Sequence, residues 1–436
     1  MKNPVVSIVG LGFVGLSLAV ASAKKKFDTY GIEINERKLR KLRSGKSDFF
    51  EPKLENYLKE SLNRKKLFLT NDLKDVLKTD ITFLTIGTPA KNDGQIDLSQ
   101  LEKVSSELSK ILKRKKSKHT IVIKSTVIPT TTLSVISPMF KKLKNVSVVV
   151  NPEFLREGNA LNDLFKPHLI VIGESKRNDG KILENYYKKF YKKLPEVLKT
   201  DLTSAEMIKY SNNAFLATKI SFINTIANIC QNLPSVDVKN IAYAIGKDPR
   251  IGPQFLNAGP GFGGSCLPKD LSALIKFSNK FEKINELLKT VKQVNQLQPS
   301  KILQILQKMN LLKSNYKISI LGVAFKKNTD DLREAVSIKI VNGLLKKGLK
   351  ISVHDPIAIE NFRKIFGEKI TYHSKVNECI KNSDCCLILT EWDEYHNLQP
   401  SLFKKYMKKT NLIDARRVLD PGKFSKFNFK AIGLGR

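Results

Sequence analysis

One cysteine stands in a setting that could make it a nucleophile. Cys266 lies in the segment 259–270, where four glycines let the backbone pass close to a ligand. Pro268 suits the first turn of a helix, so Cys266 would stand just before a helix N-terminus. That helix end and the nearby Lys269 would both lower the thiol pKa and raise the thiolate fraction. The segment indicates that Cys266 is a covalent catalyst. The same segment composition would also suit a structural cysteine that is buried after a glycine-rich turn.

The remaining cysteines lie in apolar stretches and are expected in the core; they are Cys230, Cys379, Cys385 and Cys386. With no CxxC pair, the five cysteines predict neither a zinc site nor a disulfide framework, and we expect no metal. This cysteine usage fits a reducing cytoplasm.

A second chemical signal is the phosphate-binding pattern GxGxxG near the start of the chain. Its glycines are Gly10, Gly12 and Gly15. They stand between a predicted strand at residues 5–9 and a predicted helix at residues 14–23. In this context the glycines allow a tight turn, a close approach to a pyrophosphate and helix packing, with the phosphate on the helix N-terminus.

An acidic residue completes the dinucleotide pattern. A second predicted strand, residues 29–32, ends at Glu33, which follows Gly15 by 33 − 15 = 18 positions. A carboxylate there suits the adenosine ribose diol and favours NAD over NADP. The same stretch resembles a signal peptide, because Lys2 precedes a mostly apolar run at residues 5–20. The strand, the helix and Glu33 together favour the dinucleotide interpretation.

The elements that position these residues follow a βα rhythm. Short apolar runs, which predict strands, alternate with helical patterns and imply a parallel sheet with both faces covered; they are residues 81–86, 120–123, 146–150 and 169–172. Ligands bind beyond the carboxyl ends of such strands. The segments 87–89, 124–126 and 151–153 fall at these ends and are therefore expected near a ligand.

The middle of the chain changes to helical periodicity. Residues 204–232 predict one long helix, residues 238–245 a second, and a helical pattern resumes over 270–296. This section could separate two lobes and form a dimer interface. From residue 316 a second βα lobe follows that lacks GxGxxG, so it would bind a different ligand or none. No stretch reaches the roughly 18 unbroken apolar residues that a membrane span needs.

The net charge of +35, from 76 Lys and Arg against 41 Asp and Glu, is the unusual bulk property. It is compatible with binding to nucleic acid or a membrane surface. Lysines are scattered along the whole chain, however, whereas specific nucleic-acid readers concentrate Arg and aromatic residues on one element. We therefore expect no nucleic-acid partner, and an anionic substrate would benefit from part of this charge.

Over nearly its whole length the chain resembles the UDP-glucose/GDP-mannose dehydrogenase family. The matching segments are residues 10–15, 87–89, 124–127, 151–158, 206–215, 250–252, 261–270, 324–333 and 414–416. The resemblance implies an α/β fold with an N-terminal Rossmann domain for NAD at residues 1–200. It implies a central helical dimerisation domain with the cysteine loop at 201–300, and a Rossmann-like UDP-sugar domain at 301–436.

The resemblance also implies a reaction. A primary alcohol of a nucleotide sugar would be oxidised to the acid by two NAD molecules in turn, through a thiohemiacetal and then a thioester on Cys266. Asp270, with Thr126 and a water, resembles the acceptor of the alcohol proton. Lys209 and Asn213 resemble the donors that stabilise the developing oxyanion. Glu153 resembles the base that activates water against the thioester.

Binding residues follow from the same resemblance. Those expected to contact NAD are Gly10, Gly12, Phe13, Val14, Gly15, Glu33, Lys38, Thr88, Thr126, Glu157, Lys269 and Arg333. Those expected to contact the nucleotide sugar are Phe154, Leu155, Arg156, Glu157, Lys209, Asn213, Arg250, Phe255, Gly263, Phe325, Lys326 and Arg416. Arg250 resembles an arginine that reaches the nucleotide sugar of a neighbouring subunit, so a homodimer is expected.

The chain departs from the family pattern at several positions, and several alternatives remain open. The family often has Asp-Arg where this chain has His168 and Leu169, and Gly-Thr where it has Thr130 and Thr131. UDP-glucose ranks first as substrate, with GDP-mannose or an N-acetylated UDP-hexose behind it. A two-electron dehydrogenase of the hydroxyacid type would not need Cys266, and an NAD-sensing protein would bind without turnover.

Overall fold

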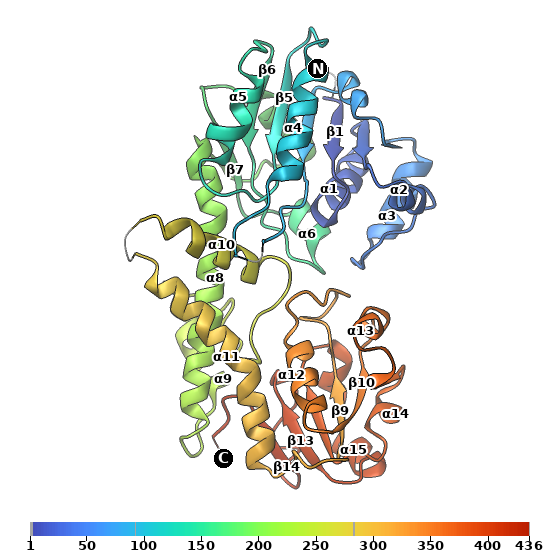
Figure 1. Ribbon diagram of the computed structural model, residues 1–436, viewed down its shortest axis with the longest axis vertical. Helices are drawn as coiled ribbons and strands as arrows, with labels where there is room; N and C mark the ends of the chain where they lie inside the picture. The colour runs from blue at the N-terminus through green and yellow to red at the C-terminus, as the bar shows by residue number, and fades with distance from the viewer. Residues whose placement is uncertain (1–2, 92, 282–283, 436) are drawn as a thin grey trace. The chain divides into compact units, whose positions relative to one another are not determined.

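The computed structural model describes residues 3–91, 93–281 and 284–435, and its chain forms two compact units, Met1–Asn212 and Asn213–Arg436 (Figure 1). Each unit contains its own mainly parallel β-sheet with helices packed on it. The predicted α/β class with two βα lobes and helices between them in sequence is confirmed.

The sheet of the first unit has the strand order β3-β2-β1-β4-β5-β6-β7-β8 in the described residues. The strands are β1 (Val6–Val9), β2 (Thr29–Ile32), β3 (Leu67–Thr70), β4 (Ile81–Leu84), β5 (His119–Ile123), β6 (Val146–Val150), β7 (Ile170–Glu174) and β8 (Val197–Asp201). The helices are α1 (Phe13–Lys24), α2 (Glu36–Arg43), α3 (Leu54–Asn63), α4 (Ser99–Leu112), α5 (Ser137–Phe140), α6 (Ala160–Phe165) and α7 (Lys181–Phe190).

One strand direction in this sheet differs from the prediction. A fully parallel sheet was expected, but β7 runs antiparallel to β6, with Val150 opposite Gly173. The connection between them carries only the short helix α6, which packs against α1. A parallel crossover usually needs a full helix to return the chain to the other edge of the sheet. The ends of β1, β4, β5 and β6 still open on one edge, because these strands are mutually parallel.

The apolar strand residues explain why both faces of this sheet are covered. Successive side chains of a strand point to opposite faces. Accordingly, Phe83 of β4 packs in a buried cluster with Leu16 of α1, whereas Leu84 packs in another with Leu108 of α4. A strand buried on both sides is held in one register, which fixes where the loop after it begins.

The sheet of the second unit has the order β11-β10-β9-β12-β13-β14 and is parallel throughout the described residues. Its strands are β9 (Lys317–Leu321), β10 (Lys350–His354), β11 (Thr371–His373), β12 (Cys385–Ile388), β13 (Asn411–Asp414) and β14 (Asn428–Ala431). The helices beside it are α12 (Val336–Leu345), α13 (Ile359–Phe366), α14 (Val376–Ile380) and α15 (Pro400–Tyr406).

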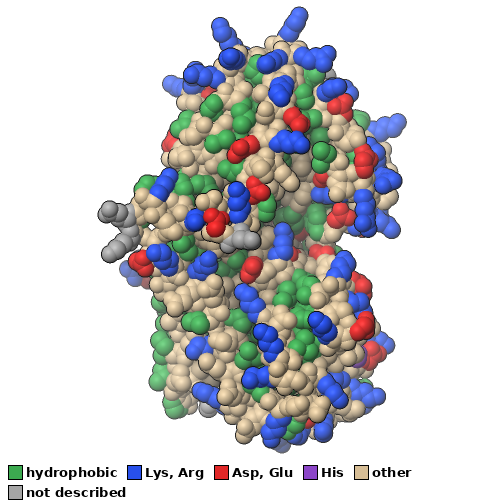
Figure 2. All heavy atoms as spheres, viewed as in Figure 1, with side chains coloured by type: hydrophobic (Ala, Val, Ile, Leu, Met, Phe, Trp, Pro, Cys, Tyr) green, Lys and Arg blue, Asp and Glu red, His purple; other side chains and the backbone are tan. Residues whose placement is uncertain are grey.

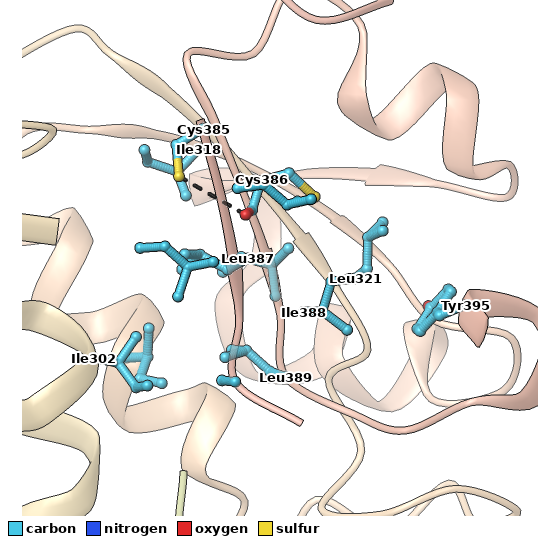
Figure 3. Packing of buried hydrophobic residues seen from close by; sticks show 14 of the residues in the cluster. Ile302, Ile318, Leu321, Cys385, Cys386, Leu387, Ile388, Leu389 and Tyr395 are labelled. Carbon is cyan, nitrogen blue, oxygen red and sulfur yellow. Dashed lines mark hydrogen bonds between the residues drawn. The ribbon is translucent and has the colours of Figure 1, made fainter. Parts of the chain in front are cut away.

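The core of the second unit contains the cysteines that the sequence placed there. Cys385 and Cys386 lie on β12 among Ile318, Leu387 and Ile388 (Figure 3). Cys230 and Cys379 are also buried, so the prediction of four core cysteines is confirmed.

The remaining helices are α8 (Leu202–Cys230), α9 (Val238–Gly246), α10 (Leu267–Ser278) and α11 (Glu286–Lys308). The long helix predicted over 204–232 is confirmed as α8. The helical pattern expected over 270–296 corresponds to two helices, because α10 ends at Ser278 and α11 begins at Glu286 and continues through Pro299. The side chain of Asn285 donates to the Ile275 carbonyl and to Ser278 Oγ, and these bonds close the end of α10.

The composition raised binding to nucleic acid or to a membrane surface as alternatives, and the surface charges and the helices bear on both. On the face in Figure 2, Lys and Arg side chains are dispersed and interleaved with Asp and Glu. Among the helices of the described residues, none is long and apolar enough to cross a membrane.

Candidate active site

The glycine-rich loop between β1 and α1 leaves room for a pyrophosphate. Gly10 has a φ of 90°, which favours glycine. A Cβ at Gly15 would lie 2.0 Å from the Gly10 carbonyl oxygen, so a larger residue would separate helix from strand. Gly12 at the N-cap of α1 has open space where a Cβ would point. With Phe13 and Val14 half-buried in the first turn, the backbone amides at this helix end fit a phosphate.

Glu33, directly after β2, is buried and held in place. Its Oε2 accepts the Leu11 amide at 3.3 Å and its Oε1 the Asn35 amide at 3.1 Å. Lys38 Nζ lies 2.9 Å from Oε2. The carboxylate therefore stands fixed beside the glycine loop, where a ribose diol would be bound.

The loops after β4 and β5 are joined to each other. Thr88 Oγ1 donates to the Thr126 carbonyl at 2.8 Å, and Ser125 Oγ donates to the Ile86 carbonyl at 2.7 Å. Both predicted threonines thus belong to one hydrogen-bonded edge of the first sheet.

A buried ion pair connects the loop after β6 to α8. Lys209 Nζ lies 3.0 Å from Glu153 Oε1, with side chains 5% and 7% exposed. Glu153 Oε2 also accepts the Leu155 amide at 2.6 Å. Burial raises the pKa of Glu153, but the charge of Lys209, the Leu155 amide and the charge of Lys124 outweigh it and hold the pKa below its usual range. Glu153 is therefore an ionised base at neutral pH.

The loop that follows Glu153 contains the predicted sugar-contacting residues. The Phe154 ring lies 5.4 Å from the His168 ring and 5.5 Å from Lys209 Nζ. Arg156 is half exposed and forms an ion pair with Asp163 at 2.6 Å. Leu155 and Glu157 are half-buried.

Cys266 in the second unit occupies the position that the sequence predicted. It is the N-cap residue of α10, and Pro268 lies in the first turn. Cys266 is half-buried, and its Sγ lies 3.4 Å from Ser265 Oγ. The amides of the first turn carry partial positive charge, which stabilises a thiolate at this end of the helix.

The first turn of α10 also carries Asp270, which is 1% exposed. Its Oδ1 accepts from Lys269 Nζ at 2.6 Å, and its Oδ2 accepts from Asn213 Nδ2 at 2.7 Å. Both oxygens of the buried carboxylate are thus engaged by predicted site residues.

The cysteine loop packs against the loop after β9. A Cβ at Gly263 would lie 2.4 Å from the Glu334 carbonyl oxygen, and one at Gly264 would lie 2.8 Å from the Phe325 ring. The Gly264 amide donates to the Arg333 carbonyl at 2.8 Å. The glycines therefore allow a close approach that places Cys266 and the 325–334 segment on one side of the second unit.

The remaining predicted residues of the second unit differ in how they are held. Arg416 donates to the Phe325 carbonyl at 2.9 Å and to the Leu389 carbonyl at 2.8 Å, so it fixes backbone beside Lys326. Arg333 and Arg250 are largely exposed and each pairs with an aspartate two residues earlier. Phe255 has a φ of 64°, an uncommon conformation for a residue with a side chain.

Comparison with known proteins places this arrangement in a family. Three domain models of the UDP-glucose/GDP-mannose dehydrogenase family match the chain: the NAD binding domain at residues 4–191, the central domain at 203–297 and the UDP binding domain at 319–421. The UDP-glucose 6-dehydrogenase YwqF of Bacillus subtilis is 37% identical over 94% of this chain and 93% of its own length.

The chain belongs to the UDP-glucose/GDP-mannose dehydrogenase family. It is an NAD-dependent nucleotide-sugar dehydrogenase. The UDP-glucose 6-dehydrogenase AglM of Haloferax volcanii is also 37% identical, over 95% of this chain and 96% of the relative. The solved structure of a UDP-glucose dehydrogenase from Pyrobaculum islandicum has a TM-score of 0.92 and 32% identity, covering 100% of this chain and 98% of that one.

Two buried residues near the predicted site residues had been given no role in the sequence analysis. Glu51 accepts the Gly158 amide at 2.7 Å and the Ala160 amide at 2.8 Å, so it anchors the loop that contains Arg156. Lys124 is buried at the end of β5. Its position directly after the apolar run 120–123 is the one sequence signal that could have indicated a buried lysine.

The departure at Thr130 has a structural consequence in this dehydrogenase. Thr130, where the family pattern has glycine, is exposed with a φ of 81°. The Thr130 amide donates to Glu206 Oε2 at 2.7 Å and the Thr132 amide to Oε1 at 2.8 Å. Burial raises the pKa of Glu206 to about 7, against the effect of these bonds. A β-branched residue is thus held in a strained conformation by a buried carboxyl group.

We expect Thr130→Gly to stabilise the protein by about 1 kcal/mol, because glycine removes the strain and keeps the backbone amide. Thermal unfolding would show a melting temperature a few degrees higher. Thr131→Gly is the matched control, since Thr131 has an ordinary φ of −55° and is expected to lose stability. A lower melting temperature for Thr130→Gly would show that the conformation is not strained.

Proposed function

We propose that the protein oxidises the primary alcohol of UDP-glucose to UDP-glucuronate through a thioester on Cys266. The observation that carries this proposal is the position of Cys266, half-buried at the start of α10, with buried Asp270 one turn further along. The UDP-glucose dehydrogenases among its relatives support this sugar. GDP-mannose and N-acetylated UDP-hexoses are the alternative substrates.

Bound NAD supplies the hydride acceptor, first for the alcohol and then, as a second molecule, for the thiohemiacetal on Cys266. The loop of Gly10, Gly12 and Gly15 and the fixed carboxylate of Glu33 would hold it. Phe13, Val14, Lys38 and Thr88 are proposed as further contacts, together with Thr126, Glu157, Lys269 and Arg333.

The proton of the alcohol needs an acceptor before hydride can leave. We assign this role to Asp270, acting with Thr126 and a water. Lys269 and Asn213 each donate to the Asp270 carboxylate, which keeps it oriented. The proton passes to Asp270 as the alcohol becomes an aldehyde, and the thiolate of Cys266 then adds to the aldehyde carbon.

The second half of the reaction generates and hydrolyses the thioester. Lys209 and Asn213 lie four positions apart on α8, so both can donate to the oxygen that becomes negative. Glu153, ionised at neutral pH, takes a proton from water, and the hydroxide displaces the thiolate of Cys266 to release the acid.

The residues proposed to hold the nucleotide sugar are those that the family resemblance implies. We propose Phe154, Leu155, Arg156, Glu157, Gly263, Phe255, Phe325, Lys326 and Arg416 for this role, with Arg250 contributed to a neighbouring subunit. Lysine and arginine suit the diphosphate of such a substrate.

The domain limits that we propose are residues 1–200 for NAD, 201–300 for the central domain and 301–436 for the UDP-sugar. The order of the matched domain models supports this division. We place the reaction in the cytoplasm, where reducing conditions would keep Cys266 as a thiol.

A homodimer is proposed on the basis of α8. Phe215, Phe222 and Ile229 are 64%, 51% and 53% exposed and repeat every seven residues. Seven residues are close to two helical turns, so the three side chains form an apolar stripe on one face of α8. A stripe of this kind on a soluble surface marks a contact, and a second copy of α8 would present the same stripe.

We expect four electrons to leave each sugar, so the wild-type protein would form two NADH per acid with UDP-glucose. Cys266→Ser is expected to lower acid release on the order of 10³-fold or more, because an alkoxide replaces the thiolate nucleophile. NADH absorbance would measure the NADH formed, and acid titration would measure the acid released. Both would be recorded with UDP-glucose, GDP-mannose and UDP-N-acetylhexoses as substrates.

Cys230→Ser is the matched control, since this buried cysteine is expected to affect stability and to leave the ratio at two. A ratio near one, as for a two-electron dehydrogenase, would contradict the proposal. Normal acid release by Cys266→Ser would remove this residue from its role.

Phe222→Glu is expected to dissociate the dimer, because it places a charge in the centre of the α8 stripe. Sedimentation velocity would show a mass near one chain instead of two. Leu287→Glu, at an exposed apolar residue on α11 outside the stripe, is expected to remain dimeric. A dimeric Phe222→Glu protein would exclude this interface.

A further inference from the structure

A lysine with no role in the mechanism above is buried beside the catalytic ion pair. Lys124 directly follows β5 and is 5% exposed. Its Nζ donates to Asn151 Oδ1 at 2.9 Å and to the Asn151 carbonyl at 3.3 Å. Burying an ammonium group is costly, so a lysine in this position requires both polar acceptors and a nearby negative charge.

The acceptor of Lys124 is itself fixed from two other elements. Tyr187 on α7 donates its hydroxyl to Asn151 Oδ1. Asn151 Nδ2 donates to the Val171 carbonyl of β7 at 2.7 Å. Asn151 directly follows β6 and precedes Glu153 by two residues, so the network holds the start of the loop that contains Glu153.

The charges around Lys124 are those of the proposed base and oxyanion donor. Glu153 attracts it and Lys209 repels it. Burial lowers the pKa of Lys124 to about 8, the charge of Glu153 opposes this shift, and the charge of Lys209 adds to it. In return, Lys124 helps to hold the pKa of Glu153 low. The three side chains form a cluster of two positive charges and one negative charge at neutral pH.

We propose that Lys124 is a positioning residue whose buried positive charge keeps Glu153 ionised as the base that activates water. The inference rests on the proposed function, because it concerns the same hydrolysis step. Without Lys124, one of the charges that lower the pKa of Glu153 would be lost, and the Glu153 carboxylate would bind a proton more tightly. The charge of Lys124 thereby extends thioester hydrolysis toward lower pH.

The test is the pH profile of acid release by Lys124→Gln, whose amide still donates to Asn151 but carries no charge. We expect the acidic limb of kcat to move up by about one pH unit, the size typical of losing a nearby opposite charge. Tyr187→Phe is the matched control, because it removes another donor to the same Asn151 oxygen without changing charge. Its kcat is expected to fall while its acidic limb stays at the wild-type pH.

Two outcomes would overturn the inference: an unshifted limb in folded Lys124→Gln, or a limb that moves equally in Tyr187→Phe. Circular dichroism checks that each variant folds. If Lys124→Gln does not fold, the acidic limb of Lys124→Met is compared with that of Tyr187→Phe in its place. Wild-type protein that fails to form two NADH per acid would contradict the proposed function itself. Wild-type turnover with an unshifted Lys124→Gln limb would contradict only the role of Lys124.

Discussion

The requirement that a buried charge be compensated determines how the site residues of this dehydrogenase are arranged. Glu153 is paired with Lys209 and the Leu155 amide, and Asp270 is held by Lys269 and Asn213. An unpaired ion in such surroundings would change its protonation or disrupt the fold. Each group to which we assign a catalytic role is therefore fixed in position by the same contacts that make its burial tolerable. This gives the reaction oriented groups before substrate binds, which is the main source of electrostatic catalysis.

Within the first unit, the parallel strands bring polar side chains from three loops to one edge of the sheet. The loops after β4, β5 and β6 supply Thr88, Thr126 and Glu153, and hydrogen bonds connect the first two. Each strand is buried on both faces, so its register is fixed, and the first residues of its loop are fixed with it. The glycines of the cysteine loop act similarly in the second unit, since they let Gly264 contact the Phe325 ring.

Local sequence patterns predicted the features that depend on neighbouring residues. Residue spacing in the sequence predicted four features: the GxGxxG loop, Glu33 after β2, the α8 helix and Cys266 at a helix start. The direction of β7 and the helix break before Asn285 were not predicted, because both depend on packing between distant segments. Lys209 by itself would have been taken for a solvated helix lysine, and only its family resemblance suggested a role. The segment 124–126 was expected near a ligand, but the burial of Lys124 was not predicted, because it depends on Asn151 and Glu153 at the end of another strand.

Covalent attachment of the sugar to Cys266 is the central claim, and Glu153→Gln offers the most direct measurement of it. This variant would lack the base for hydrolysis, so the thioester would accumulate. After mixing with UDP-glucose and excess NAD, acid quenching and peptide mass spectrometry would identify the modified residue. The account predicts a burst of about two NADH per chain, little acid release and a uronyl adduct on the peptide containing Cys266. A two-NADH burst that leaves this peptide unmodified would contradict it.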